Sequence, residues 1–181
     1  MKVLIDACVL FPTLLRDLVL THAATGAFEP LWSARILEEW RRAAARKSQT
    51  DGEIASVEIA AITARFPNAC VPPNAQTESR LSLPDPDDVH VLAAAITAGA
   101  DELLTFNIKD FPTRTLSGEG ILRRDPDGFL LEAYHANPSA MSANVDAVLT
   151  RAKAHGIDVS NTRAILKRAR VPRLAKALSQ V

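Results

Sequence analysis

Cysteine, aromatic residues and long hydrophobic runs are scarce in this sequence. Its two cysteines, Cys8 and Cys70, form no Cys-x-x-Cys pair, which excludes a disulfide scaffold and a cysteine-based zinc site and predicts two reduced core thiols. No stretch approaches the ~18 consecutive apolar residues of a membrane span. A short apolar run that ends at Asp6 follows Lys2, so we expect a cytoplasmic protein without a signal peptide and without a membrane partner.

Motifs of several enzyme and metal-binding classes are also missing. The sequence has no G-x-S-x-G elbow, which argues against a serine hydrolase. Its glycines at 26, 52 and 99 are typical of turns and helix ends rather than of a phosphate-binding loop. The four histidines have no metal-ligand spacing. His90 is close in sequence to Asp88, and we interpret it as a helix-surface histidine.

The composition is that of an ordinary globular protein whose charge is unevenly distributed. Of 181 residues, 48% are hydrophobic and 23% are charged, which suits one domain with a small appendage. Residues 1–128 hold 13 Lys and Arg against 18 Asp and Glu, whereas residues 129–181 hold 8 against 3. The net charges of the two parts are therefore −5 and +5. The basic part indicates a polyanion or an acidic surface nearby, or a solvated helix face.

Short apolar runs alternate with segments of helical periodicity in the first two thirds of the chain. We expect strands at residues 2–6, 28–32, 69–71 and 103–106, and helices at residues 13–24, 34–46, 51–66 and 89–98. Ser33 is a good N-cap and Gly99 a good helix end. This alternation predicts a doubly wound α/β fold with a central parallel sheet and right-handed crossovers.

The pattern changes after residue 125, where strands no longer occur between the helices. Further helices are expected at residues 129–135, 139–154, 161–170 and 173–178. We therefore predict two domains, an α/β body at residues 1–125 and a small all-α extension at residues 126–181.

Acidic side chains follow the expected strands or open the helix between them. Asp6 follows the first strand, Asn107 and Asp110 follow the last, and Asp85, Asp87 and Asp88 precede the helix at 89–98. Ligands of open parallel sheets bind beyond the carboxyl ends of the strands, so we expect these acids to converge. Two like charges ~4 Å apart repel by roughly 4 kcal/mol at an effective dielectric of 20. A hard cation such as Mg²⁺ or Mn²⁺, with a phosphate substrate, is the natural neutralising partner.

Four stretches occur in an order that resembles the PIN domain over about residues 1–125. They are Leu4-Ile-Asp6 with Val9-Leu10, Ser33-x-x-Ile-Leu-x-Glu39, Leu83-Pro-Asp-Pro-Asp-Asp88 with the alanine-rich helix, and Leu103-Leu-Thr-Phe-Asn107-x-x-Asp110. The resemblance implies a three-layer α/β/α fold and a Mg²⁺- or Mn²⁺-dependent ribonuclease whose catalytic acids are Asp6, Glu39 and Asp88. Helical geometry alone does not choose between Glu38 and Glu39, which point about 100° apart.

Asn107 departs from the family pattern, in which the last strand ends in an aspartate. We expect Asp6 and Asp88 to be the principal metal ligands, with Glu39 and Asp110 as further metal-binding residues. Asp85, Asn107 and Thr105 are expected to orient water or substrate phosphate without binding the ion as principal ligands. A second metal ion would be held more weakly with an amide in place of an acid.

The resemblance also extends to a subgroup of VapC-type toxins that carry a C-terminal helical extension. It implies an RNA substrate, a cognate antitoxin protein that covers the site, and possible assembly as a homodimer. In the basic tail we expect Arg168, Arg170 and Arg173 to contact nucleic-acid phosphates. Ordinary helix solubility and docking on the acidic body are the alternatives for this tail.

Three other functions are compatible with parts of the sequence. The run that ends in Asp6 resembles the first motif of haloacid-dehalogenase-like phosphatases, but Cys8 stands where that family has a second acid. A PIN fold that binds RNA or protein with weak or no catalysis is the main alternative, because of Asn107. A DNA or structure-specific nuclease would use the same residues.

Overall fold

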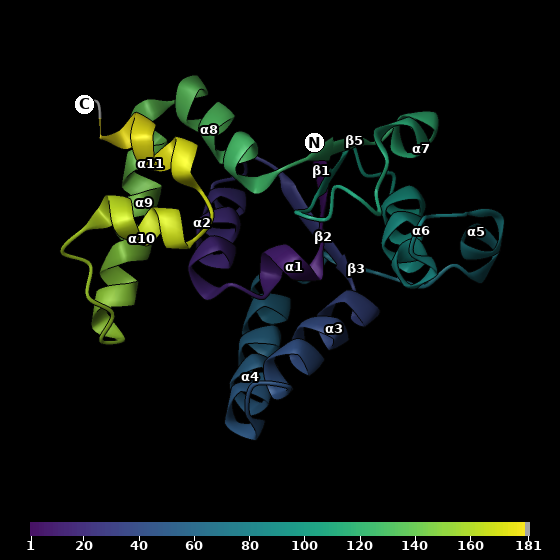
Figure 1. The fold of residues 1–181 in the computed structure, drawn as a ribbon, viewed down its shortest axis with the longest axis horizontal. Coiled ribbons are helices and arrows are strands. Elements are labelled where there is room, and N and C mark those ends of the chain that lie inside the picture. Colours follow the sequence, from purple (N-terminus) through teal and green to yellow (C-terminus); the bar gives the residue numbers. More distant parts are fainter. Residues whose placement is uncertain (180–181) are drawn as a thin grey trace. The chain divides into compact units, whose positions relative to one another are not determined.

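A five-stranded sheet carries the first part of the chain, and the computed structural model describes residues 1–179. The strand order is β3-β2-β1-β4-β5 (Figure 1). The strands are β1 (Lys2–Ile5), β2 (Glu29–Ser33), β3 (Cys70–Val71), β4 (Glu102–Leu104) and β5 (Leu122–Arg124). β1 pairs in parallel with both β2 and β4, and β2 pairs in parallel with β3. The direction of strand addition therefore reverses between β1 and β4, which is where such sheets bind ligands.

The strands are short, apolar and buried, as expected for a parallel sheet covered on both faces. Val3, Leu4 and Ile5 of β1 and Leu103 and Leu104 of β4 have no exposed surface. α6 packs against β1 to β4, whereas α1 and α3 lie together, with α3 against β2 (Figure 1). The predicted three-layer α/β/α arrangement is therefore confirmed.

Several helices around this sheet begin or end at residues with clear capping roles. They are α1 (Ala7–Leu10), α3 (Ala34–Ala45), α4 (Gln49–Arg65), α5 (Ala75–Arg80), the 3₁₀ turn η1 (Pro86–Asp88), α6 (Val89–Ala98) and α7 (Thr113–Gly118). Ser33 Oγ accepts a hydrogen bond from the Ile36 backbone N–H at 3.2 Å, as an N-cap does. Gly99 ends α6 with a φ of 62°, a left-handed conformation that favours glycine.

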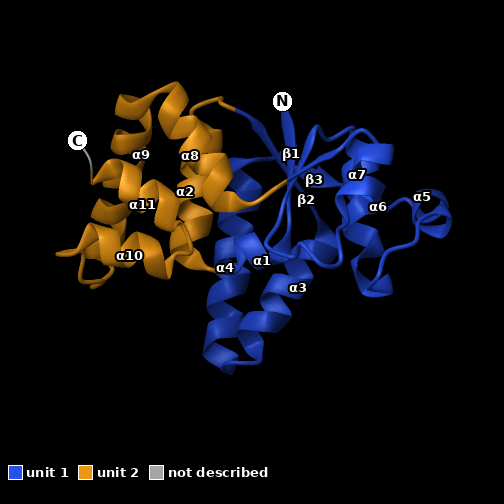
Figure 2. Cartoon of the chain, turned by 45° about the horizontal axis from the view of Figure 1, so that its top comes forward, with its two compact units in different colours: residues 1–11, 28–123 blue, residues 12–27, 124–181 orange. Residues whose placement is uncertain are grey.

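A second compact unit consists entirely of helices (Figure 2). Its members are α2 (Thr13–Ala24), α8 (Pro126–Ala136), α9 (Pro138–Ala154), α10 (Thr162–Arg168) and α11 (Pro172–Leu178). The unit joins residues 12–27 to the chain from Arg124 onward, and the first unit comprises Met1–Phe11 and Phe28–Arg123. Asn144 Nδ2 of α9 donates to the Leu18 carbonyl of α2 at 3.1 Å, which fixes this helix pair.

A buried carboxylate holds α11 in the second unit. Asp127 of α8 is only 5% exposed. Its Oδ2 accepts from the Arg173 backbone N–H at 2.9 Å and its Oδ1 from the Leu174 N–H at 3.0 Å. These are the unsatisfied donors of the first turn of a helix, so Asp127 acts as a cap from a distant element.

Most of the longer predicted elements occur at the predicted places, including the four C-terminal helices and the strand at residues 2–6. Five short elements were not predicted, namely α1, α5, α7, η1 and β5. The division at residue 125 stays a prediction, although α2 belongs to the same compact unit as the C-terminal helices. Within residues 1–179, no helix combines the length and the apolar character that a membrane crossing requires.

Candidate functional site

Asp6 lies directly after β1 and is almost fully buried, with 6% of its surface exposed. Its Oδ2 accepts a hydrogen bond from Thr105 Oγ1 at 2.6 Å and another from Cys8 Sγ at 3.1 Å. Thr105 follows β4, the strand beside β1. The two donors fix one oxygen of Asp6 and leave the other oxygen without a protein hydrogen bond among the described residues.

Cys8 and Thr105 are themselves held by the backbone after β4. Thr105 Oγ1 accepts from the Asn107 N–H at 2.9 Å, and Cys8 Sγ accepts from the Phe106 N–H at 3.3 Å. Burial, followed by the nearby Asp6 carboxylate, raises the pKa of the Cys8 thiol to about 12. The thiol therefore stays protonated and donates to Asp6. This role of Cys8 is not predictable from the sequence, which indicates only a core thiol, and the same expectation for Cys70 is wrong because Cys70 is exposed.

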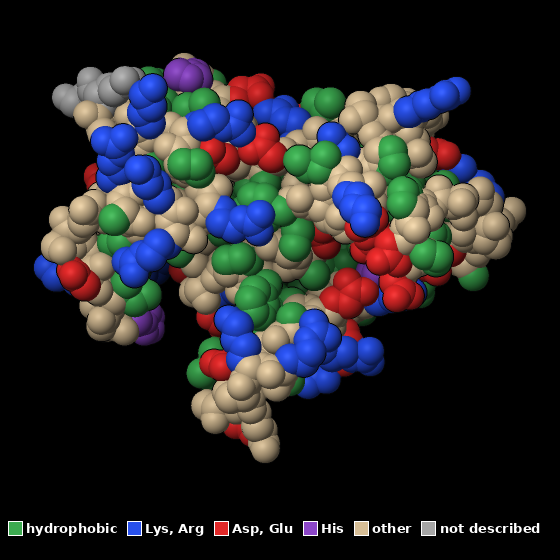
Figure 3. Space-filling view, viewed as in Figure 1, with side chains coloured by type: hydrophobic (Ala, Val, Ile, Leu, Met, Phe, Trp, Pro, Cys, Tyr) green, Lys and Arg blue, Asp and Glu red, His purple; other side chains and the backbone are tan. Residues whose placement is uncertain are grey.

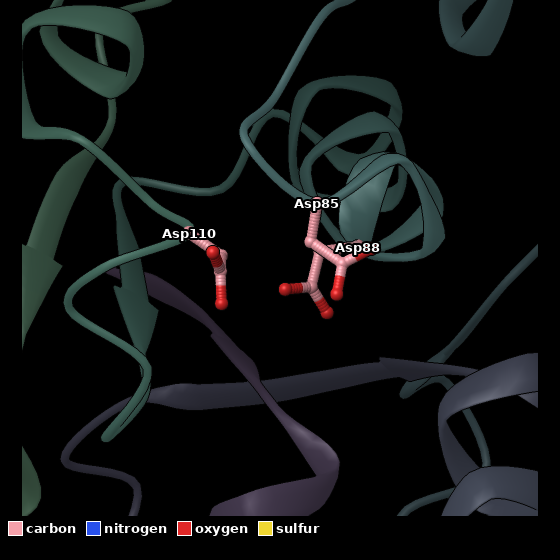
Figure 4. Close-up of side chains that lie close together, drawn as sticks. All are labelled: Asp85, Asp88 and Asp110. Carbon is pink, nitrogen blue, oxygen red and sulfur yellow. The ribbon is translucent and has the colours of Figure 1, made fainter.

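Asp85, Asp88 and Asp110 form a tight group of carboxylates. One oxygen of each lies within 4.8 Å of the others. Asp110 approaches from the loop after β4, while Asp85 and Asp88 approach from the turn before α6, and their carboxylates border the same space (Figure 4). Asp85 keeps its position by accepting from the Asp87 backbone N–H at 2.9 Å.

The pKa of Asp88 is affected by the charges of the other predicted site acids. Burial is the largest cause that raises the pKa of Asp88, from 3.8 to about 6, and the carboxylates of Asp6, Asp85, Asp110 and Glu39 raise it further. Like charges disfavour ionisation only when they are near. The structure groups Asp85, Asp88 and Asp110, whereas Asp6 and Glu39 lie outside that group and act on Asp88 through their charge, so their predicted role at the same site stays a prediction.

The acids have few compensating charges. Asp6, Asp85, Asp88 and Asp110 have no Lys or Arg partner at ion-pair distance among residues 1–179. In the space-filling view, Asp and Glu side chains gather in one patch between α6 and α3 (Figure 3). An uncompensated set of carboxylate oxygens is the donor set that a hard divalent cation prefers. The residues present therefore fit a metal ion of this kind.

Asn107 turns its amide nitrogen, not its oxygen, toward the acids. Its Nδ2 donates to Asp88 Oδ2 at 2.8 Å, and its Oδ1 accepts from the Asp110 backbone N–H at 3.3 Å. Both ends of the amide are therefore used within the protein. Asn107 orients Asp88 as a hydrogen-bond donor, and its carbonyl oxygen is engaged elsewhere.

Glu39 faces a buried histidine, and its neighbour Glu38 faces elsewhere. Glu39 Oε1 lies 2.7 Å from His90 Nε2. Hydrogen bonds from Arg41 and then Arg42 lower the pKa of Glu38 to about 2, so Glu38 is paired along its own helix. Of the two acids, Glu39 is the one whose charge acts on Asp88.

The interpretation of His90 as a helix-surface residue is wrong. His90 is only 4% exposed, because α6 turns this face toward β2 and β3 and toward Glu39 of α3. Every residue of α6 from His90 to Ala95 is buried. The apolar segment that follows His90, from Val91 to Ala95, was the signal in the sequence that this helix lies inside.

The three arginines predicted to contact nucleic acid lie in the second unit. Arg173 is paired there, since its Nη2 donates to Asp125 Oδ1 at 2.5 Å and its Nε to Asp127 Oδ2 at 3.0 Å. Arg170 has a φ of 65°, an unfavourable value for a residue with a side chain. Arg168 is exposed and acts electrostatically on Asp158. Nucleic-acid contact by these residues stays a prediction.

Fold and site together define a class of protein. Acidic side chains that meet at the switch point of a parallel α/β sheet make a centre suited to a divalent cation and a phosphate substrate. A sequence model described as the PIN domain matches residues 2–109, which is more than half of the chain, and the chain therefore belongs to the PIN domain family. PIN domains are generally metal-dependent nucleases. Comparison with curated proteins and with solved structures found no match.

Proposed function

We propose that this protein is a metal-dependent endoribonuclease that hydrolyses RNA phosphodiester bonds. The observation that carries the proposal is the group formed by Asp85, Asp88 and Asp110, in which one carboxylate oxygen of each lies within 4.8 Å of the others. Carboxylates held this close together favour the binding of an external cation. The metal-dependent nuclease activity that is general in the PIN family supports the same conclusion.

The chain's own residues have distinct tasks in this proposal. Asp88, Asp85 and Asp110 would hold a Mg²⁺ or Mn²⁺ ion, with Asp6 and Glu39 beside them. When bound, such an ion supplies positive charge for the phosphodiester and acidifies a water molecule. Thr105 and Cys8 donate hydrogen bonds to one oxygen of Asp6, and Asn107 donates a hydrogen bond to one oxygen of Asp88. Each acid thus presents its remaining oxygen in a fixed direction.

Isosteric variants test the proposal directly. Asp6→Asn and Asp88→Asn remove one charge each without changing side-chain size, and both are expected to abolish Mg²⁺- or Mn²⁺-dependent cleavage of RNA. The matched control is Asp87→Asn, because Asp87 is exposed and lies on the same 3₁₀ turn as Asp88. Circular dichroism checks that the variants fold. Full activity of Asp6→Asn and Asp88→Asn would contradict the proposal.

The finer part of the proposal is a role as the toxin of a toxin–antitoxin pair in the cytoplasm. It rests on the resemblance to VapC-type toxins and implies a small antitoxin partner and assembly as a homodimer. Expression of the chain is expected to arrest growth, and co-expression of a short protein encoded next to it is expected to relieve the arrest. Growth unaffected by an RNA-cleaving protein would contradict the toxin role while leaving the nuclease proposal intact.

A second candidate function is an RNA- or protein-binding module with weak or no catalysis. Asn107 favours it, because an amide N–H₂ group faces Asp88 where the family pattern has an acid. Metal titration by calorimetry, followed by cleavage assays on a panel of RNAs, separates the two. Metal and RNA binding without cleavage would favour the binding module.

A further inference from the structure

We propose that a pocket beside the acidic cluster binds one nucleobase of the RNA, next to the phosphodiester bond that is cleaved. This inference deepens the proposed ribonuclease function and rests on it. The pocket has a volume of about 230 Å³. Its walls come from α3, α5, α6 and the segment that follows β3.

The pocket lies at the same edge of the sheet as the acids. Ser33 ends β2 and Val71 ends β3, and both line the pocket. Asp6 follows β1 and Asn107 follows β4, the next strands along the sheet. In a parallel sheet all these strand ends lie at one edge. An RNA strand that runs along this edge can place a phosphate at the acids and a neighbouring base over β2 and β3.

Two side chains connect the pocket to the acidic cluster. His90 lines the pocket, and its Nε2 lies 2.7 Å from Glu39 Oε1. Arg35 also lines it, with its Nε 3.7 Å from the same Glu39 oxygen and its Nη2 3.4 Å from the Asp87 carbonyl oxygen. His90 and Arg35 therefore line the pocket and also lie close to Glu39, one of the predicted site acids.

The size and the walls of the pocket suit a flat ring. A pocket of 230 Å³ is smaller than the ~300–1,000 Å³ that accommodates a drug-sized ligand. Apolar groups of Val71, Pro72, Pro73 and Ala94 form much of the lining. A space of this size suits a single flat base, with the ribose and phosphate of its nucleotide outside the pocket.

The pocket has one cationic and one anionic side chain in its lining. The guanidinium of Arg35 lies 3.7 Å from Glu39 Oε1, so the unpaired charge in the lining is that of Glu78. Glu78 lines the pocket, and its carboxylate has no hydrogen bond or ion pair with any residue that the structure describes. A free carboxylate repels a phosphate but accepts a hydrogen bond from an exocyclic amino group, as acidic side chains do with cytosine. We therefore expect a base with an amino group, in preference to uracil, at the position next to the cleaved bond.

Substrate preference is the measurement that tests the pocket. Short RNAs that differ only in the base beside the cleaved bond are compared by kcat/KM, with the metal ion present. The wild-type protein is expected to prefer adenine, cytosine or guanine over uracil by roughly 10-fold, the scale of a lost base-edge hydrogen bond. Glu78→Gln is expected to reduce this preference to about twofold, because a neutral amide accepts more weakly than a carboxylate.

A second variant and a control make the result specific. Ala34→Leu narrows the pocket from its exposed rim and is expected to weaken cleavage of all four RNAs through KM. The control is Gln76→Ala, an exposed position on the same helix as Glu78 that does not line the pocket. Equal cleavage at all bases by the wild type, an unchanged base preference in Glu78→Gln, or an unchanged KM in Ala34→Leu would overturn the pocket.

A binding experiment separates failure of the pocket from failure of the nuclease proposal. Cytidine and uridine are titrated into metal-free protein, and backbone amide shifts are followed by NMR. Shifts at Val71 and Ala94 that are larger with cytidine support the pocket even if no RNA is cleaved. Absence of such shifts overturns it, whereas RNA cleavage abolished by Asp88→Asn would still uphold the nuclease.

Discussion

Replacement of Asp88 by asparagine is expected to stabilise the metal-free protein at neutral and alkaline pH. Burial, and then the carboxylates around it, raise the pKa of Asp88 from 3.8 to about 6, so the charged form opposes folding. The amide removes this charge. It still offers an oxygen to Asn107 Nδ2, which donates to Asp88 at 2.8 Å in the wild-type protein.

The magnitude follows from the difference between folded and unfolded chains. A pKa that rises from 3.8 to about 6 corresponds to roughly 3 kcal/mol at high pH. Asp88 is only partly buried, so solvent screening reduces this to about 1–1.5 kcal/mol. For a chain of this size we expect Asp88→Asn to raise the melting temperature by about 4 °C at pH 8.

The sign of the pH dependence is fixed by the direction of the shift. Below pH 3.8 Asp88 is protonated in both states, and the full stability is present. As pH rises toward about 6, the unfolded chain releases the proton before the folded chain does, so stability is lost. The advantage of Asp88→Asn is therefore expected to be small near pH 4, to grow between pH 4 and 6 and to be constant above.

Denaturant and thermal unfolding in EDTA between pH 4.5 and 8 measure this advantage. The exposed Asp87→Asn variant serves as the control and is expected to follow the wild type. Addition of millimolar Mg²⁺ is expected to stabilise the wild type, because a ligand that binds only the folded state raises its stability. A variant no more stable than the wild type at pH 8, or an advantage that is equal at all pH values, would refute the electrostatic reasoning.

Three further predictions concern other parts of the chain. Asp127→Ala is expected to cost about 3 kcal/mol in urea unfolding, because two N–H groups of α11 lose a buried charged acceptor; a loss below 1 kcal/mol would contradict the cap. Arg170→Gly is expected to be about 1 kcal/mol more stable than Arg170→Ala, since the φ of 65° favours glycine, and equal stabilities would remove the argument from strain. At pH 8 an alkylating reagent is expected to modify exposed Cys70 quickly and Cys8 only after unfolding, because the pKa of Cys8 is about 12; mass spectrometry that finds both modified at equal rates would contradict this.

The longer helices and the main strands were predictable because their signals are local. The helix expected at residues 13–24 is α2 (Thr13–Ala24), and Gly99 ends α6 as expected. α1, α5 and α7 are too short, at 4 to 6 residues, to show a helical period. The packing of α2 on α9 was also not predictable, because periodicity gives the apolar face of a helix but not the partner of that face.

The gathering of the site acids followed from topology, whereas their orientation did not. Asp6 and Asp110 follow β1 and β4, and neighbouring parallel strands bring their ends together whatever the side chains do. The direction of the Asn107 amide depends on two hydrogen bonds that only tertiary structure forms. The contribution of Cys8 to the position of Asp6 likewise requires the backbone after β4.

The neutral character of the groups around the acids is what keeps the site available for a cation. Thr105, Cys8 and Asn107 orient the carboxylates by hydrogen bonds and add no positive charge. A lysine or arginine at any of these places would relieve the repulsion and stabilise the fold, but it would occupy the position of the metal ion. Selection for stability alone would favour such a replacement. Selection for a functional site retains the repulsion between the carboxylates, even though it destabilises the fold. We therefore interpret the instability expected from the charge of Asp88 as the physical counterpart of the divalent-ion binding that we propose for this site.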